Sequence, residues 1–145
     1  MSDSIHPAYV EHVNATVQDV DLAVRYLTTA LPEWRVRGGG TMDWYGKPMR
    51  WVHVGSDAHY IALQSGGVGP GMDWRGNGTG IKHVGIVVPS VQAVVDRLTA
   101  AGYELDHWAG ESAHRKRVYF MLGDEFQIEF VEYTAQGAAL RNLYA

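Results

Sequence analysis

Residues 10–30 read VEHVNATVQDVDLAVRYLTTA, and residues 81–101 read IKHVGIVVPSVQAVVDRLTAA. The second stretch repeats the first after 71 positions, with eight identical residues among 21 and no gap. The identities place His12 on His83 and Leu27 on Leu98. Self-similarity at a fixed distance indicates a duplicated structural unit, so we interpret the chain as two copies of one supersecondary unit.

Each copy predicts a strand, a helix and then three further strands. Residues 10–17 and 81–88 are rich in Val, Ile and Thr, as β-strands are. Asp19 and Ser90 occupy matching helix N-cap positions, and apolar residues recur at helical spacing until Pro32 and Gly102. The later strand candidates are 35–38, 50–54 and 60–64, then 103–107, 117–122 and 126–133. The fold class is therefore expected to be α+β, built from two βαβββ modules.

The spacing of glycine divides the chain into segments. Seven glycines lie within residues 65–80, which is typical of a linker. We expect a first module at 9–65, a Gly-rich linker at 66–80, a second module at 81–133 and a C-terminal tail at 134–145. The tail predicts a short helix through Leu140 and Leu143.

Composition excludes several classes of protein. The chain has 145 residues, of which 46% are hydrophobic and 19% charged, as in a globular domain. Because there is no cysteine, disulfides and thiolate sites are excluded, which agrees with a cytoplasmic location. The net charge is −4 and the dense basic run is confined to residues 115–117, which argues against nucleic-acid binding. Residues 1–9 are polar and lack a hydrophobic core segment, so no signal peptide is expected there. No apolar run approaches the roughly 20 residues of a membrane span, so no membrane contact is expected.

Strand alternation predicts a metal site. The apolar residues of the first strand of each copy should face the helices, which turns His12 and His83 to the opposite face. Glu129 alternates with Ile128 and Phe130 and should point to that same face. Two imidazoles related by the repeat and one carboxylate match a two-His-one-carboxylate site for Fe, Mn, Co, Ni or Zn, with positions left open for substrate.

The same segments resemble the vicinal oxygen chelate superfamily, which includes glyoxalase I, methylmalonyl-CoA epimerase, extradiol dioxygenases and bleomycin-resistance proteins. The resemblance is carried by residues 11–13, 82–86, 118–120 and 126–131. It implies a cup-shaped mixed β-sheet around a metal pocket, a small-molecule substrate and a homodimer. It also implies ligand positions at His12, Ala62, His83 and Glu129.

Ala62 departs from the superfamily pattern. The position commonly carries Glu in glyoxalase I and its near relatives, and alanine can neither bind a metal nor abstract a proton. Tyr60 and Gln64 share the face of Ala62, and Gln64 could either reach the metal or cap the strand end. Tyr119 lies on the strand before the last one of the second module, where it could be a general acid or base or belong to the core. Tyr60, Gln64 and Tyr119 are the candidate catalytic residues.

Four residues are candidates for substrate binding, namely His53, Trp51, Trp108 and Arg117. The tryptophans could line an aromatic pocket or belong to the core or a dimer interface. Arg117 could recognise a carboxylate or phosphate, or it could belong to a solvated strand edge.

Two functions follow from these residues. The first is a divalent-metal-dependent enzyme acting on a small oxygen-chelating substrate, either a lyase or isomerase or a non-haem Fe(II) dioxygenase. The alternative is a non-catalytic drug- or metabolite-binding protein resembling the bleomycin-resistance proteins. Because that kind of protein lacks the metal ligands, retention of His12, His83 and Glu129 favours the enzyme.

Overall fold

The computed structural model describes residues 7–144, so the start of the polar segment 1–9 lies outside the described residues. The first half contains β1 (His12–Thr16), α1 (Val20–Ala30), β2 (Arg35–Trp44), β3 (Lys47–Gly55) and β4 (Tyr60–Gln64). The second half contains β5 (His83–Val87), α2 (Val91–Ala100), β6 (Leu105–Trp108), β7 (Arg115–Leu122) and β8 (Phe126–Tyr133), followed by α3 (Ala138–Arg141). The expected α+β fold with a duplicated βαβββ order is confirmed.

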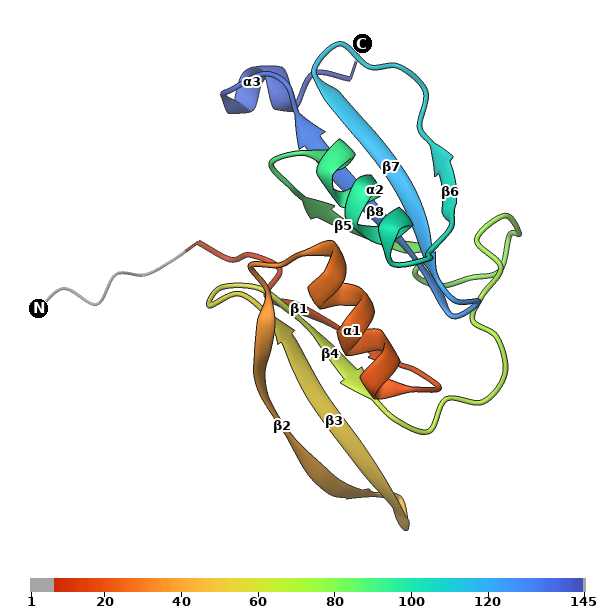
Figure 1. Cartoon of the computed structure of the whole chain (residues 1–145). Helices are drawn as coiled ribbons and strands as arrows, with labels where there is room; N and C mark the ends of the chain where they lie inside the picture. Colours follow the sequence, from red (N-terminus) through yellow and green to blue (C-terminus); the bar gives the residue numbers. More distant parts are fainter. Residues whose placement is uncertain (1–6, 145) are drawn as a thin grey trace, which may run out of the picture.

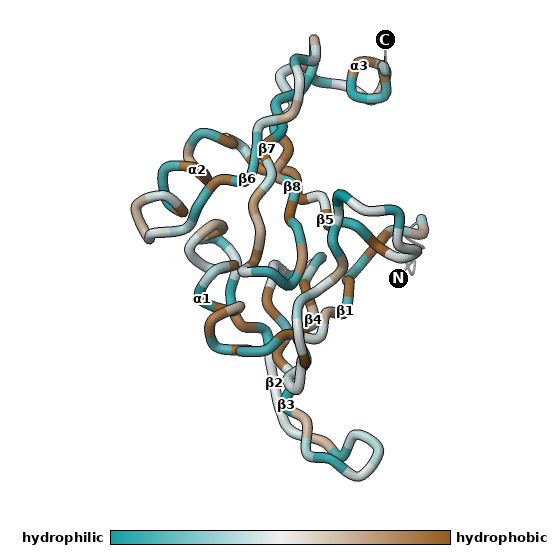
Figure 2. Tube along the Cα trace, turned by 90° about the vertical axis from the view of Figure 1, so that its right-hand side faces the viewer, coloured by the Kyte–Doolittle hydropathy of each residue, from teal (hydrophilic) through white to brown (hydrophobic). Residues whose placement is uncertain are grey.

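Each half forms one four-stranded mixed sheet. The strand orders are β1-β4-β3-β2 and β5-β8-β7-β6, and the first strand of each half pairs in parallel with the last. The register aligns Asn14 with Ala62 and Gly85 with Glu129, and Asn14 and Gly85 are 71 positions apart, so Ala62 and Glu129 occupy equivalent places in the two halves. Both long helices cover the same side of the two sheets and lie next to each other (Figures 1 and 2).

The helices begin where the sequence predicted. The Asp19 carboxylate accepts a hydrogen bond from the backbone N–H of Leu22 at 3.0 Å, and the Ser90 hydroxyl accepts one from Ala93 at 3.1 Å. Such caps satisfy a backbone donor that the first helical turn leaves without a partner. None of the helices that the structure describes has the length and apolar character needed to cross a bilayer.

One apolar core joins the two halves. Leu27 of α1 and Leu98 of α2 are both fully buried in it, together with Phe120 and Phe130 of the second sheet. The guanidinium of Arg97 donates two hydrogen bonds, at 2.8 and 3.2 Å, to the carbonyl oxygen that ends α1. A close-packed core resists sliding, so this contact fixes the orientation of one half against the other.

The hairpin β2–β3 is longer than expected and projects beyond the helices (Figure 1). The expectation of separate strands at 35–38 and 50–54 missed its outer part. A Cβ on Gly40 would lie 3.2 Å from the indole of Trp51, so glycine lets this ring pack against the neighbouring strand. Tyr45 and Gly46 form the turn with φ values of 49° and 86°, as a two-residue hairpin turn requires.

Tyr26 provides a test of the core. Its side chain is fully buried, and its hydroxyl has no hydrogen-bond partner in the described part of the chain. Burial raises the pKa of Tyr26 well above its usual value, and the nearby Tyr103 adds to the shift. We expect Tyr26→Phe to increase the free energy of unfolding by about 1 kcal/mol at neutral pH, because a buried group without a partner costs stability.

The gain should grow above about pH 10, where tyrosine ionises in the unfolded chain but stays neutral in the folded wild type. Urea unfolding at pH 7 and at about pH 10.5 measures both effects. Tyr144→Phe, at a site that is 83% exposed, is the control and should change nothing. Equal stability of wild type and Tyr26→Phe at both pH values would contradict the prediction.

Candidate functional site

The sheet faces opposite the helices carry most of the polar residues singled out above. On the second sheet, His83 Nε2 lies 2.9 Å from Glu129 Oε2, and the Glu129 side chain is only 12% exposed. Gly85 lies opposite Glu129 on the neighbouring strand, and a Cβ there would meet nothing within 4 Å. The pair formed by His83 and Glu129 therefore faces open space.

Tyr119 stands beside this pair. It lies opposite Glu129 in the register of β7 and β8, and its ring meets that of His83 edge-on at 5.6 Å. Burial raises the pKa of Tyr119, and the charge of Glu129 and a hydrogen bond to it add to the shift. At neutral pH Tyr119 is therefore a phenol that can donate a hydrogen bond.

His12 lies on the other sheet. Its Nδ1 is 2.9 Å from Glu11 Oε1, and its ring stacks on Tyr60 with centroids 4.7 Å apart. Hydrogen bonds from His12 and Tyr60 lower the pKa of Glu11. Within residues 7–144, no group of three or more His, Cys, Asp or Glu side chains is arranged to hold a metal ion. The structure thus brings together His83 and Glu129 but not His12, and the three-ligand site stays a prediction.

The other first-sheet candidates surround His12. Tyr60 lies between His12 and His53, whose rings are 4.7 and 4.5 Å from its own, and Trp51 lies 4.8 Å beyond His53. Burial lowers the pKa of His53, and electrostatic interactions with His12 and Arg37 add to the shift. The neutral imidazole of His53 can therefore accept a proton.

Gln64 and the candidates Trp108 and Arg117 have other surroundings. The side-chain oxygen of Gln64 accepts a hydrogen bond from the Asn14 amide at 2.7 Å, which ties Gln64 to the neighbouring strand. Trp108 and Arg117 line a groove together with the loop 109–113. On β7, Arg117 has the same strand parity as Tyr119, which directs it to the face that carries Glu129.

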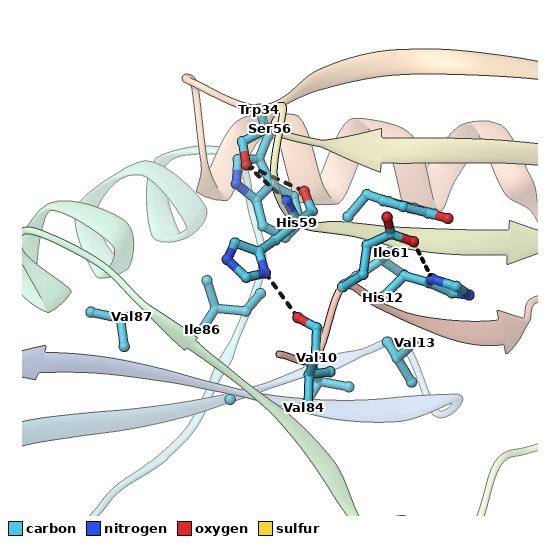
Figure 3. A pocket seen from close by; sticks show the side chains of 13 residues that line it. Val10, His12, Val13, Trp34, Ser56, His59, Ile61, Val84, Ile86 and Val87 are labelled. Carbon is cyan, nitrogen blue, oxygen red and sulfur yellow. Dashed lines mark hydrogen bonds and ion pairs between the residues drawn. The ribbon is translucent and has the colours of Figure 1, made fainter. Parts of the chain in front are cut away.

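A pocket of about 470 Å³ separates the edges of β1 and β5 (Figure 3). Its lining is mainly apolar and includes Val13, Trp34, Val84 and Ile86. In the described part of the chain, β1 pairs only with β4 and β5 pairs only with β8, so each has an open edge. Exposed apolar residues lie on or beside these edges: Val10 (81%), Ile81 (72%) and Val87 (58%).

Comparison with known proteins identifies this architecture. No family model and no curated protein matches the sequence. A glyoxylase/bleomycin resistance protein/dioxygenase domain from Frankia sp. EAN1pec superposes with a TM-score of 0.72 at 22% identity, over 95% of this chain and all of that one. A glyoxalase family protein from Bacillus cereus superposes with a TM-score of 0.70 at 16% identity, over 93% of this chain and all of that one. The chain has the vicinal oxygen chelate fold.

A third protein with this fold was solved with a metal. It is a variant of the fosfomycin resistance protein FosX from Listeria monocytogenes, complexed with Mn(II) and 1S,2S-dihydroxypropylphosphonic acid. Its TM-score is 0.65 at 14% identity, over 90% of this chain and 95% of that one. The vicinal oxygen chelate fold therefore accommodates a divalent metal in at least one of these neighbours.

The donors on the second sheet suit such a metal. An imidazole nitrogen and a carboxylate oxygen from neighbouring strands are ligand types that Fe, Mn, Co, Ni and Zn accept. Their mutual contact at 2.9 Å shows that both donor atoms reach one point. The chemistry and placement of His83 and Glu129 therefore fit two ligands of such a metal.

Two contacts between a carboxylate and the next histidine in the sequence, Asp106 with His107 and Glu11 with His12, were not predicted from the sequence. His107 Nδ1 lies 2.8 Å from Asp106, and its ring stacks between Trp74 at 5.0 Å and Tyr119 at 4.4 Å. Strand alternation would have placed these two neighbours on opposite faces, but the register of β6 shifts between Leu105 and His107, which allows the contact. Strand alternation likewise assigns Glu11 to the face opposite His12. Glu11 lies just before β1 begins, where alternation no longer applies.

Proposed function

We propose that this protein is a divalent-metal-dependent enzyme of the glyoxalase or dioxygenase type, acting on a small oxygen-chelating organic substrate. The observation that carries the proposal is the close pair of His83 and Glu129, which faces open space beside Gly85. The FosX structure with Mn(II) supports the proposal, because it is a protein of this fold that binds a divalent metal. Iron, manganese, cobalt, nickel and zinc all suit the donors.

In this proposal the third ligand is His12 from a second copy of the chain. The shared core of α1 and α2 and the hydrogen bonds of Arg97 hold the two halves together, and within the described residues His12 forms no metal-binding group with His83 and Glu129. The open edges of β1 and β5, with Val10, Ile81 and Val87 exposed beside them, give a second copy an apolar surface to cover. The result is a symmetric homodimer.

The residues of the chain then have separable roles. A bound metal would polarise the substrate oxygens that it chelates. Tyr119 lies opposite Glu129 on the neighbouring strand, where its hydroxyl can donate a hydrogen bond that would orient this ligand. His53 supplies a neutral imidazole that can accept a proton, since Ala62 cannot. The missing side chain at position 62 argues against ordinary glyoxalase I chemistry and favours the three-ligand type of site.

Metal content tests the proposal. Untagged wild type, His83→Ala and His114→Ala should be compared by elemental mass spectrometry, with His114 as a control histidine from the loop before β7. We expect about one metal ion per chain in wild type and in the control, and almost none in His83→Ala. A wild type without metal, even after soaking in divalent ions, would overturn the proposal and favour the non-catalytic binding protein.

A further inference from the structure

Glu11 holds one side of the His12 ring. Its Oε1 lies 2.9 Å from His12 Nδ1, and Figure 3 shows the other ring nitrogen of His12 turned away from this contact. A carboxylate can only accept hydrogen bonds, so Nδ1 must carry the hydrogen. In a neutral imidazole, Nε2 then keeps its free electron pair.

The rest of the ring is also restrained. The His12 and Tyr60 rings are nearly parallel, with 12° between their planes. Tyr60 is held in turn by the His53 ring at 4.5 Å and by the Arg37 guanidinium at 4.2 Å from its centroid. The side chain of His12 is nevertheless 44% exposed, so the restrained ring remains accessible.

We propose that Glu11 is a positioning residue that fixes the Nδ1–H tautomer of His12 and presents Nε2 as a metal ligand. This inference rests on the proposed function. Histidines that bind metals usually donate their other N–H to a carboxylate, carbonyl or water, which sets the tautomer and makes the ligand more basic. His83 is arranged differently, because its Nε2 faces Glu129, which is itself a candidate ligand.

The contact has a specific structural origin. Neighbouring residues inside a strand point to opposite faces, so they cannot normally hydrogen-bond through their side chains. Because β1 starts at His12, Glu11 is free to turn back onto the ring. An exposed ion pair adds little to stability. If the contact between Glu11 and His12 had only a structural role, a change in the His12 tautomer would leave the metal affinity unchanged.

The tautomer can be read without any substrate. Long-range 15N–1H NMR of metal-free protein distinguishes Nδ1–H from Nε2–H for each histidine in wild type, Glu11→Gln and Glu11→Ala. We expect Nδ1–H at His12 in wild type and in Glu11→Gln, whose amide oxygen still accepts the hydrogen. Glu11→Ala should shift His12 toward Nε2–H. Asp57→Ala, which removes an exposed partner of Arg35, is the control and should leave His12 unchanged.

Metal affinity supplies the second measurement. Competition with a chelator, using Mn(II) and Zn(II) alone, should show binding about 10- to 100-fold weaker in Glu11→Ala and nearly wild-type in Glu11→Gln. An unchanged His12 tautomer in Glu11→Ala would overturn the inference, and so would a changed tautomer with unchanged affinity. A wild type that binds neither ion would overturn the proposed function instead, and the NMR result would still report on the contact between Glu11 and His12.

Discussion

A heterodimer of one His12→Ala chain and one His83→Ala chain should bind about one metal ion, whereas either variant alone should bind none. In the proposed dimer each site takes His12 from one copy, and His83 and Glu129 from the other. The heterodimer therefore keeps one site with all three ligands and one site that lacks both histidines. Co-expression with two different affinity tags isolates it, and elemental mass spectrometry counts the metal.

The matched control pairs His83→Ala with Glu129→Ala. Both substitutions lie on the second sheet, so each site of that heterodimer has lost one ligand and no metal should be retained. If the ligands instead came from a single chain, neither heterodimer would bind metal. Metal in the control heterodimer would show that one of these two side chains is not a ligand.

Leu98→Ala should destabilise both halves of the molecule together. Leu98 lies on α2, is fully buried and belongs to the core that α1 and α2 share. Removing a buried leucine side chain leaves a cavity and costs about 2–5 kcal/mol. Because the core is common, the loss should reach β4 as well as β8. Urea unfolding measures the total, and hydrogen exchange of the backbone amides of the two strands measures its distribution.

The control for this substitution is Leu140→Ala in α3, where the side chain is 41% exposed and the change should stay within about 0.5 kcal/mol. Both experiments need one fixed protein concentration, since an assembling chain gains stability with concentration. Loss of exchange protection in β8 alone, with β4 unchanged, would contradict the shared core.

The fold was predictable because the repeat combines identical residues, strand-forming composition, helix N-caps and helical spacing of apolar residues at matching positions. The matches of His12 with His83 and Leu27 with Leu98 located equivalent strands and helices, and the observed register confirms the equivalence of Ala62 and Glu129. Strand alternation also anticipated that Glu129 and His83 would meet on one face, as their contact shows.

Other features depend on contacts that have no local signature. The outer half of the β2–β3 hairpin was missed because glycines at 38–40 weaken the strand pattern, while the packing of Trp51 on Gly40 depends on tertiary structure. Glu11 was missed because it lies just before β1, where strand alternation no longer applies. That His12 forms no group with His83 and Glu129 within the described residues was not predictable, since a sequence pattern gives the face of a side chain but not the placement of two sheets.

The open edges of β1 and β5 have a consequence for how this protein should be handled. Each edge leaves backbone groups and apolar side chains without a neighbouring strand in the single chain. In the proposed dimer these surfaces are covered only after two chains meet, so complete folding becomes a second-order process. Dilution would then expose the same edges again, and with them the risk of aggregation through strand pairing.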